Sequence, residues 1–194
     1  LIWLHEMAGV GKSAVTFTVA ERMRSLKMIE QMNIEMRLVG TFFFSCKHTN
    51  HSMTGYFFVM LAYQLACNFP SIQEDLNRAI HQNPALLDPN KSLCNQMEGL
   101  FLKPLLCGCP PFAFVVDALD KCMSKTEVAD LIFLLGRALR EPDLPTIHIL
   151  LMSHSKDHIH DAMQERGMCP LVWEIPVNFW RGCGCDYLIR WCRY

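Results

Sequence analysis

Five residues near the start of the sequence have the types and spacing of a phosphate-binding loop. They read Gly9-Val10-Gly11-Lys12-Ser13 and stand between an apolar run and a segment of helical periodicity. Phosphate is bound well by inward-facing backbone N–H groups, a cation and the N-terminus of a helix. Gly9 and Gly11 permit a tight backbone, Lys12 can reach the β- and γ-phosphates of a nucleotide, and the Ser13 hydroxyl can ligate Mg²⁺.

This loop departs from the full Walker A pattern, G-x-x-x-x-G-K-[ST], because Glu6 stands where the pattern has its first glycine. A carboxylate there has the same sign of charge as the phosphates. The two residues that serve binding, Lys12 and Ser13, are intact. We therefore predict a site for ATP or GTP with Mg²⁺. The predicted nucleotide-binding residues are Gly9, Val10, Gly11, Lys12, Ser13 and Ala14.

An aspartate about a hundred residues further on is the second predicted metal ligand, beside Ser13. Asp117 follows the apolar run Phe114-Val115-Val116, which is typical of a buried strand. At the C-terminal end of a strand in a doubly wound sheet, its carboxylate lies next to where the loop would hold phosphates. It can then hold Mg²⁺ through water, as a Walker B aspartate does. The alternative is that Asp117 is the N-cap of a following helix.

Strands that alternate with helices must position these residues. Apolar runs predict strands at 2–5, 39–45, 112–116, 146–152 and 171–175. Helical spacing predicts helices at 13–26, at 126–140 and at 156–165, and three helices between 54 and 106. A methionine stripe through 27–37 leaves open an extension of the first helix. This order predicts an α/β three-layer sandwich of the P-loop NTPase type, with a mainly parallel five-stranded sheet and helices on both faces. We expect one domain at 1–177 and leave the tail, 178–194, unassigned.

Composition excludes several partners. Lysine and arginine total 18 against 19 aspartates and glutamates, so no charged surface for nucleic acid or an anionic membrane is expected. The longest apolar stretch, 56–67, is short of the roughly 20 residues that cross a bilayer, and residues 1–5 lack signal-peptide features. Ten cysteines in a chain with an ample apolar core favour free thiols and a cytoplasmic protein, rather than disulfides or a zinc site at Cys107/Cys109 and Cys183/Cys185.

Several short motifs, in the same order and register, resemble the NACHT domain of STAND-type P-loop NTPases, and most closely the fungal NACHT proteins. The motifs are Trp3-Leu4-His5 running into the loop, Phe42-Phe43-Phe44-Ser45, Leu61-Ala62-Tyr63-Gln64-Leu65-Ala66, Pro104-Leu105 and Asp117-Ala118-Leu119-Asp120. The likeness extends to about residue 175. It implies a nucleotide-binding signal-transduction module, flanked in the same protein by an effector region and sensor domains, with nucleotide-dependent homo-oligomers as a further possibility.

Two departures from that family fall on positions that serve hydrolysis. The family usually continues Asp-Ala-Leu-Asp with glutamate, and this chain has Lys121. After the fourth strand the family usually has Thr-Ser-Arg-Pro, whose arginine senses the γ-phosphate, and here His154 takes its place. An imidazole with a pKa near 6.5 is mostly neutral at pH 7. The candidate catalytic positions are therefore Asp120, Lys121 and His154, and we expect hydrolysis to be weak or lost.

Three functions remain open from the sequence. The first is a regulatory switch that binds ATP or GTP with Mg²⁺ and sets the arrangement of neighbouring domains. The second is an active NTPase in which Asp120 is the catalytic acid group and protonated His154 replaces the arginine. The third is a scaffold that has lost nucleotide binding because Glu6 excludes it.

Overall fold

The computed structural model of the chain describes residues 1–5, 12–26, 37–47, 53–106, 108–122, 124–165 and 167–176. Within these ranges the strands are β1 (Ile2–His5), β2 (Arg37–Phe43), β3 (Phe112–Asp117), β4 (Ile147–Ser153) and β5 (Trp173–Pro176). They form one five-stranded sheet in the order β2-β3-β4-β1-β5, and every pair is parallel. The predicted α/β fold with a parallel sheet is confirmed.

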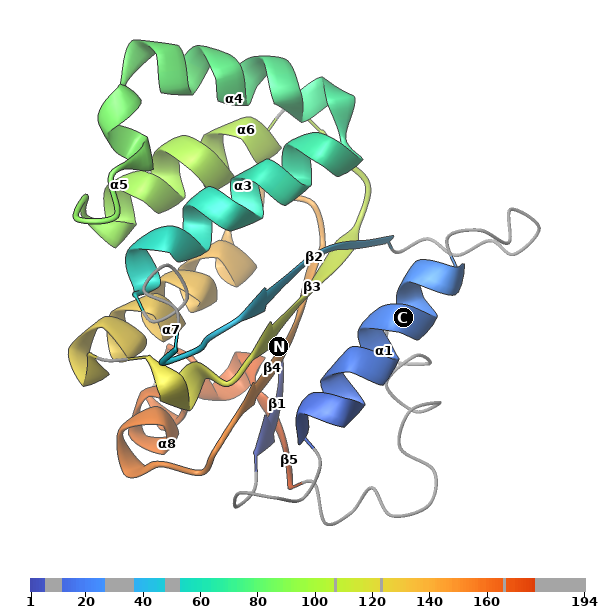
Figure 1. The fold of residues 1–194 in the computed structure, drawn as a ribbon, viewed down its shortest axis with the longest axis vertical. Helices are drawn as coiled ribbons and strands as arrows, with labels where there is room; N and C mark the ends of the chain where they lie inside the picture. The colour runs from blue at the N-terminus through green and yellow to red at the C-terminus, as the bar shows by residue number, and fades with distance from the viewer. Residues whose placement is uncertain are drawn as a thin grey trace.

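Helices cover both faces of this sheet, which gives three layers (Figure 1). Helix α1 (Lys12–Leu26) lies on one face. The other face carries α3 (Phe57–Asn68), α7 (Lys125–Arg140) and α8 (Asp157–Gln164), with α4 (Pro70–Gln82) outside α3. This arrangement is what right-handed crossovers between parallel strands produce.

The interior strand β3 shows why the chain folds into a sheet covered on both sides. All six of its residues are buried. Phe112, Phe114 and Val116 belong to the larger core, beneath the many helices, whereas Ala113 and Val115 belong to the smaller core that includes Val19 and Ala20 of α1. Successive side chains of a strand point to opposite faces, so a run that is apolar at every position requires a helix layer on each side.

The segment between β2 and β3 is helical, and its prolines mark where helices begin. A 3-10 turn, η1 (Thr54–Tyr56), leads into α3, Pro70 is the first residue of α4, and Pro84 opens the 3-10 turn η2 (Pro84–Leu87). The third stretch is continuous from residue 93 to 105. It consists of α5 (Leu93–Met97), a π-helical turn η3 (Glu98–Leu102) and α6 (Lys103–Leu105). The predicted three helices are thus present.

Side chains of α3 cover the outer edge of β2, which is an edge strand of the sheet. The Gln64 amide accepts a hydrogen bond from the Thr41 N–H at 2.8 Å and donates to the Thr41 carbonyl at 3.1 Å. The Asn68 amide donates to the Val39 carbonyl at 2.9 Å. Satisfying these backbone groups from the side protects the edge from pairing with another strand.

Several predicted boundaries are wrong. Arg37 opens β2, so the first helix does not extend to it, and residues 27–36 lie outside the described part of the chain. Leu171 belongs to a 3-10 turn, η5 (Cys169–Leu171), and not to the last strand, because the Pro170 ring favours a turn there. The tail, 178–194, lies outside the described residues. No described helix is long and apolar enough to span a bilayer.

Candidate functional site

Ser13 and Asp117, the two predicted metal ligands, are in contact. The Ser13 hydroxyl in the first turn of α1 hydrogen-bonds to the Asp117 carboxylate at the end of β3. Strand β4 lies between β3, which carries Asp117, and β1, the strand that precedes α1 in the sequence. Ser13 and Asp117 meet because α1 crosses the sheet and packs against β2, β3 and β4. The carboxyl edge of the sheet therefore holds a hydroxyl and a carboxylate side by side.

The Asp117 carboxylate is buried, with 3 % of the residue exposed. Burial raises its pKa above the ordinary 3.8, and the charge of Asp120 acts in the same direction. Hydrogen bonds from the Ser13 hydroxyl, the Ala118 N–H and the Thr16 hydroxyl oppose this but do not cancel it. A cation beside the carboxylate would favour its ionised form.

These residues fit a magnesium ion bound together with a nucleotide. Mg²⁺ prefers oxygen ligands, and proteins usually hold it with one or two carboxylates, waters and substrate phosphates rather than with a complete cage. Ser13 is exposed at this edge, so its hydroxyl is accessible to such an ion. The described residues contain no cluster of three His, Cys, Asp or Glu side chains that could hold a metal by themselves. The donor set thus suits an ion that arrives with phosphate oxygens.

The structure also brings together the three predicted catalytic positions, in a second cluster around Asp120. The Asp120 side chain is 1 % exposed. Its Oδ1 accepts a hydrogen bond from the His154 backbone N–H at 2.9 Å, which ties the 3-10 turn η4 (Leu119–Lys121) to the end of β4. Its Oδ2 lies 3.4 Å from the Lys121 ammonium and 3.6 Å from His154 Nδ1, and it has no hydrogen-bond partner. One carboxylate oxygen therefore has a structural partner, and the other has only long contacts to the Lys121 ammonium and the His154 imidazole.

Lys156 belongs to this cluster and was missed from the sequence. Its ammonium donates to the Asp120 carbonyl at 3.0 Å. The cluster therefore contains a second lysine ammonium besides that of Lys121, two residues beyond His154. The signal in the sequence was a basic residue directly before the first acidic turn of α8, which is common enough to pass unnoticed.

Thr16 was missed as well. It is fully buried, at 0 % exposure, and its hydroxyl contacts both the Asp117 carboxylate and the Met152 sulfur. Residues three apart share one face of a helix, so its spacing from Ser13 could have indicated that both face the same site.

Most of the predicted phosphate-binding loop lies outside the described residues. Glu6, Gly9, Val10 and Gly11 lie there, and only the backbone of Lys12 is described, as the first residue of α1. Ala14 is exposed, and its carbonyl accepts a hydrogen bond from the Thr18 hydroxyl at 2.8 Å.

Side-chain contacts join β1, the strand before the loop, to β5 on one side and to β4 on the other. His5, its last residue, forms an ion pair with Glu174 of β5 at 2.8 Å when protonated, and stacks on Trp3 with ring centroids 4.4 Å apart. The Trp3 indole donates to Ser153 of β4 at 2.9 Å. A loop that starts at His5 thus has a well-anchored origin.

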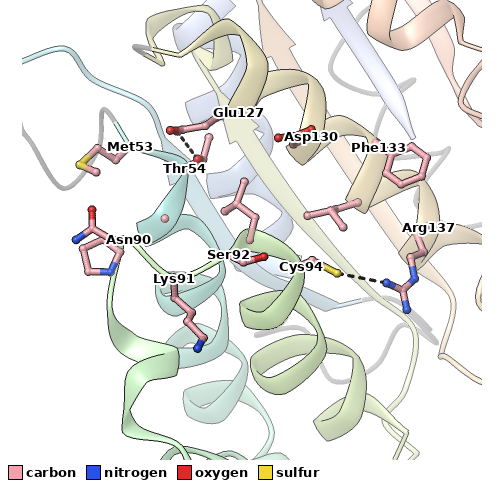
Figure 2. Close-up of a pocket in the computed structure, with 14 residues that line it drawn as sticks. Met53, Thr54, Asn90, Lys91, Ser92, Cys94, Glu127, Asp130, Phe133 and Arg137 are labelled. Atoms are coloured by element: carbon pink, nitrogen blue, oxygen red, sulfur yellow. Dashed lines mark hydrogen bonds between the residues drawn. The ribbon is translucent and has the colours of Figure 1, made fainter.

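A cavity of about 560 Å³ lies away from these residues (Figure 2). It is an open pocket between η1, the segment leading into α5 and one face of α7, and no predicted site residue lines it. Thr54 donates to Glu127 across one end at 2.6 Å, and the Arg137 guanidinium contacts the Cys94 sulfur at 3.7 Å at the other. Asp130 and the half-exposed Phe133 ring line the wall between them.

Fold and site together define a three-layer α/β protein with a hydroxyl–carboxylate pair at the carboxyl edge of its parallel sheet. A family model described as "Nephrocystin 3, N-terminal" matches residues 1–154, and the chain belongs to this family. The match covers the predicted loop, Asp117, Asp120 and His154, and ends directly after β4. No curated protein and no solved structure matches the chain.

Proposed function

We propose that this chain is a NACHT-like P-loop module that binds ATP or GTP with Mg²⁺ and acts as a regulatory switch in an intracellular signalling protein. The observation that carries the proposal is the hydrogen bond between Ser13 and Asp117. The two residues are predicted, from separate motifs, to hold one metal ion, and they are in contact although β4 lies between β3 and β1, the strand that precedes α1.

The energetic state of Asp117 supports this function. A buried carboxylate whose pKa is raised is a cost to the folded protein, because its ionised form lacks full compensation. Such groups are frequent at functional sites, where a ligand supplies what the fold does not. Here the missing partner is a cation, and a nucleotide would bring Mg²⁺ to this edge of the sheet.

We further propose that hydrolysis is weak. In P-loop enzymes the protein positions the attacking water and stabilises charge in the transition state, and a positioned arginine contributes about 10³ to 10⁵ in rate. Asp120 Oδ1 is engaged by the backbone of His154, and the Lys121 ammonium approaches Oδ2. A carboxylate placed between these groups is a poor acceptor for a proton from water.

One observation favours the second candidate, an active NTPase. Asp120 Oδ2 is buried without a hydrogen-bond partner, so it could still accept one from a water. In that case turnover would depend on protonation of His154 and be faster at pH 6 than at pH 8. The switch predicts negligible turnover at both values.

The setting of the module in a longer protein is also a proposal. The resemblance to NACHT domains implies flanking effector and sensor domains as its partners. Among the described cysteines, six are free thiols, which suits a reducing compartment. The free cysteines are Cys46, Cys67, Cys94, Cys109, Cys122 and Cys169.

Binding of fluorescent ATP and GTP to the wild type and to Lys12→Ala tests the proposal. Lys12 is the cation that the loop supplies, and charge-assisted contacts to phosphate are strong hydrogen bonds. We expect at least a tenfold loss of affinity, about 1.4 kcal/mol. Lys125→Ala, at the exposed start of α7, is the matched control and should bind as the wild type does. If Lys12→Ala and the wild type bound both nucleotides with equal affinity, the assignment of this loop as the nucleotide-binding site would be wrong.

A further inference from the structure

Thr16 is a polar residue in a place where the core would accept an apolar one. It lies in α1 and is completely buried, on the side of the helix that faces the sheet together with Val19 and Ala20. Burying a hydroxyl without a hydrogen bond costs free energy, so buried hydroxyls are nearly always paired. The partner of this hydroxyl therefore indicates what the residue does.

Two acceptors contact the Thr16 hydroxyl, the Asp117 carboxylate and the Met152 sulfur. A hydroxyl has one proton to donate. A carboxylate is a much stronger acceptor than a thioether, and hydrogen bonds to a charged group are about twice as strong as neutral ones. The proton consequently goes to Asp117, and the Met152 sulfur packs against the hydroxyl oxygen.

The first two turns of α1 thus place two hydroxyls on one carboxylate. Ser13 is exposed at the edge of the sheet, whereas Thr16 is buried beneath it. A hydroxyl that ligates Mg²⁺ uses an oxygen lone pair, so the orientation of the exposed Ser13 hydroxyl would be set by the ion as well as by Asp117. Thr16 is too deeply buried to ligate the ion, so its hydrogen bond to Asp117 would be the same with and without the metal.

We propose that Thr16 is a positioning residue, whose buried hydroxyl holds the Asp117 carboxylate in place from beneath while the Ser13 hydroxyl ligates the magnesium ion that accompanies a nucleotide. This inference rests on the proposed nucleotide-binding function and adds a residue to it. A direct consequence is that Thr16 contributes to the magnesium-dependent part of nucleotide affinity and not to the part that remains without the metal.

Two pairs of variants isolate the hydroxyl. Thr16→Val keeps the shape of the wild-type side chain and removes the hydroxyl. Thr16→Ser keeps the hydroxyl and removes the methyl group, and Thr16→Ala lacks both, so the serine and alanine variants differ from each other only in the hydroxyl. Thr18→Val is the matched control, because the Thr18 hydroxyl bonds to the Ala14 carbonyl of its own helix.

The experiment measures nucleotide affinity as a function of Mg²⁺ concentration, and again in EDTA, alongside thermal unfolding of each variant. For Thr16→Val, the Mg²⁺ concentration that produces half of the magnesium-dependent gain in nucleotide affinity should be at least tenfold higher than for the wild type. Its nucleotide affinity in EDTA should lie within twofold of the wild-type affinity. Thr16→Ser and Thr18→Val should need no more than about threefold extra Mg²⁺. If Thr16→Val does not fold, the difference between Thr16→Ser and Thr16→Ala should show the same tenfold effect.

Two outcomes would overturn the inference without touching the proposed function. One is a wild-type magnesium requirement in Thr16→Val, or equal requirements in the serine and alanine variants. The other is a loss of affinity in EDTA as large as the loss with Mg²⁺, which would make Thr16 a core residue only. If the wild type itself binds no nucleotide at any Mg²⁺ concentration, the proposed function fails, and the role of Thr16 fails with it.

Discussion

Replacing Asp117 by asparagine should have opposite effects on stability and on function. Asparagine has nearly the same shape, carries no charge and resembles the protonated acid. Because burial raises the pKa of Asp117, the folded protein favours the neutral form of this side chain more than the unfolded chain does. Asp117→Asn should therefore stabilise the metal-free protein at pH 7 while it removes the carboxylate that is proposed to hold Mg²⁺.

The size of the stabilisation follows from linkage. Each unit by which folding raises a pKa is about 1.4 kcal/mol of preference for the neutral form. The raised pKa already includes the opposing hydrogen bonds from Ser13, Thr16 and Ala118, so these need no separate subtraction. Each kcal/mol by which the substitution stabilises the fold corresponds to an increase in Tm of about 2–4 °C for a chain of this size. The loss of nucleotide affinity in the presence of Mg²⁺ should be at least tenfold, or about 1.4 kcal/mol.

Thermal unfolding in EDTA and nucleotide titrations with and without Mg²⁺ measure both effects on the same preparation. Asp130→Asn is the control, because Asp130 is an exposed carboxylate on α7 outside the site. It should change neither Tm nor affinity. A lower Tm of Asp117→Asn in EDTA would refute the account of the buried charge, and an unchanged magnesium dependence would refute the assignment of Asp117 as the metal-holding carboxylate.

Three further predictions concern pH, thiol chemistry and packing. Because folding raises the pKa of Asp117, the metal-free native state binds more protons than the unfolded chain between pH 3.8 and the raised pKa, so this group lowers the free energy of unfolding as pH rises through that range. The Tm advantage of Asp117→Asn should therefore shrink as pH falls below the raised pKa towards 3.8. Burial raises the pKa of the Cys109 thiol to about 11, so at pH 8 iodoacetamide should label Cys109 much more slowly than the exposed Cys46. Mass spectrometry measures the two labelling rates, and equal rates would contradict the burial of Cys109. A methyl group at Gly55 would stand 1.9 Å from the Pro89 carbonyl oxygen, which is backbone and cannot turn away. Gly55→Ala should therefore lower the free energy of unfolding, measured by denaturant titration, by about 1–3 kcal/mol. An unchanged free energy of unfolding would show that η1 is loosely packed.

The sequence predicted the elements of this fold but not their order in the sheet. Runs such as 112–116, apolar at every position, identify strands that are buried on both faces. Such a run carries no periodicity that says which strand lies beside it, because both neighbours bury the same kind of surface. The position of β4 between β1 and β3 therefore became known only from the structure.

The same limit applies to the site. Ser13 and Asp117 were predicted because each belongs to a motif with a known spacing, and the Asp120, Lys121 and His154 positions because a family resemblance pointed to them. The contacts of Thr16 and Lys156 depend on how α1 and the segment before α8 pack against the end of β3, and no local pattern encodes this. The hydrogen bond from the His154 N–H to Asp120 Oδ1 likewise depends on packing that no local pattern encodes.

Nucleotide binding by the purified protein tests the central claim most directly. The wild-type chain would be titrated calorimetrically with ATP and with GTP, in Mg²⁺ and in EDTA, after any nucleotide that it carries has been released by denaturation and identified by chromatography. The account predicts either bound nucleotide in the purified protein or saturable binding of one nucleotide per chain that weakens when Mg²⁺ is removed. Folded protein that carries no nucleotide and binds neither ATP nor GTP would contradict it and leave the non-binding scaffold as the function of this fold.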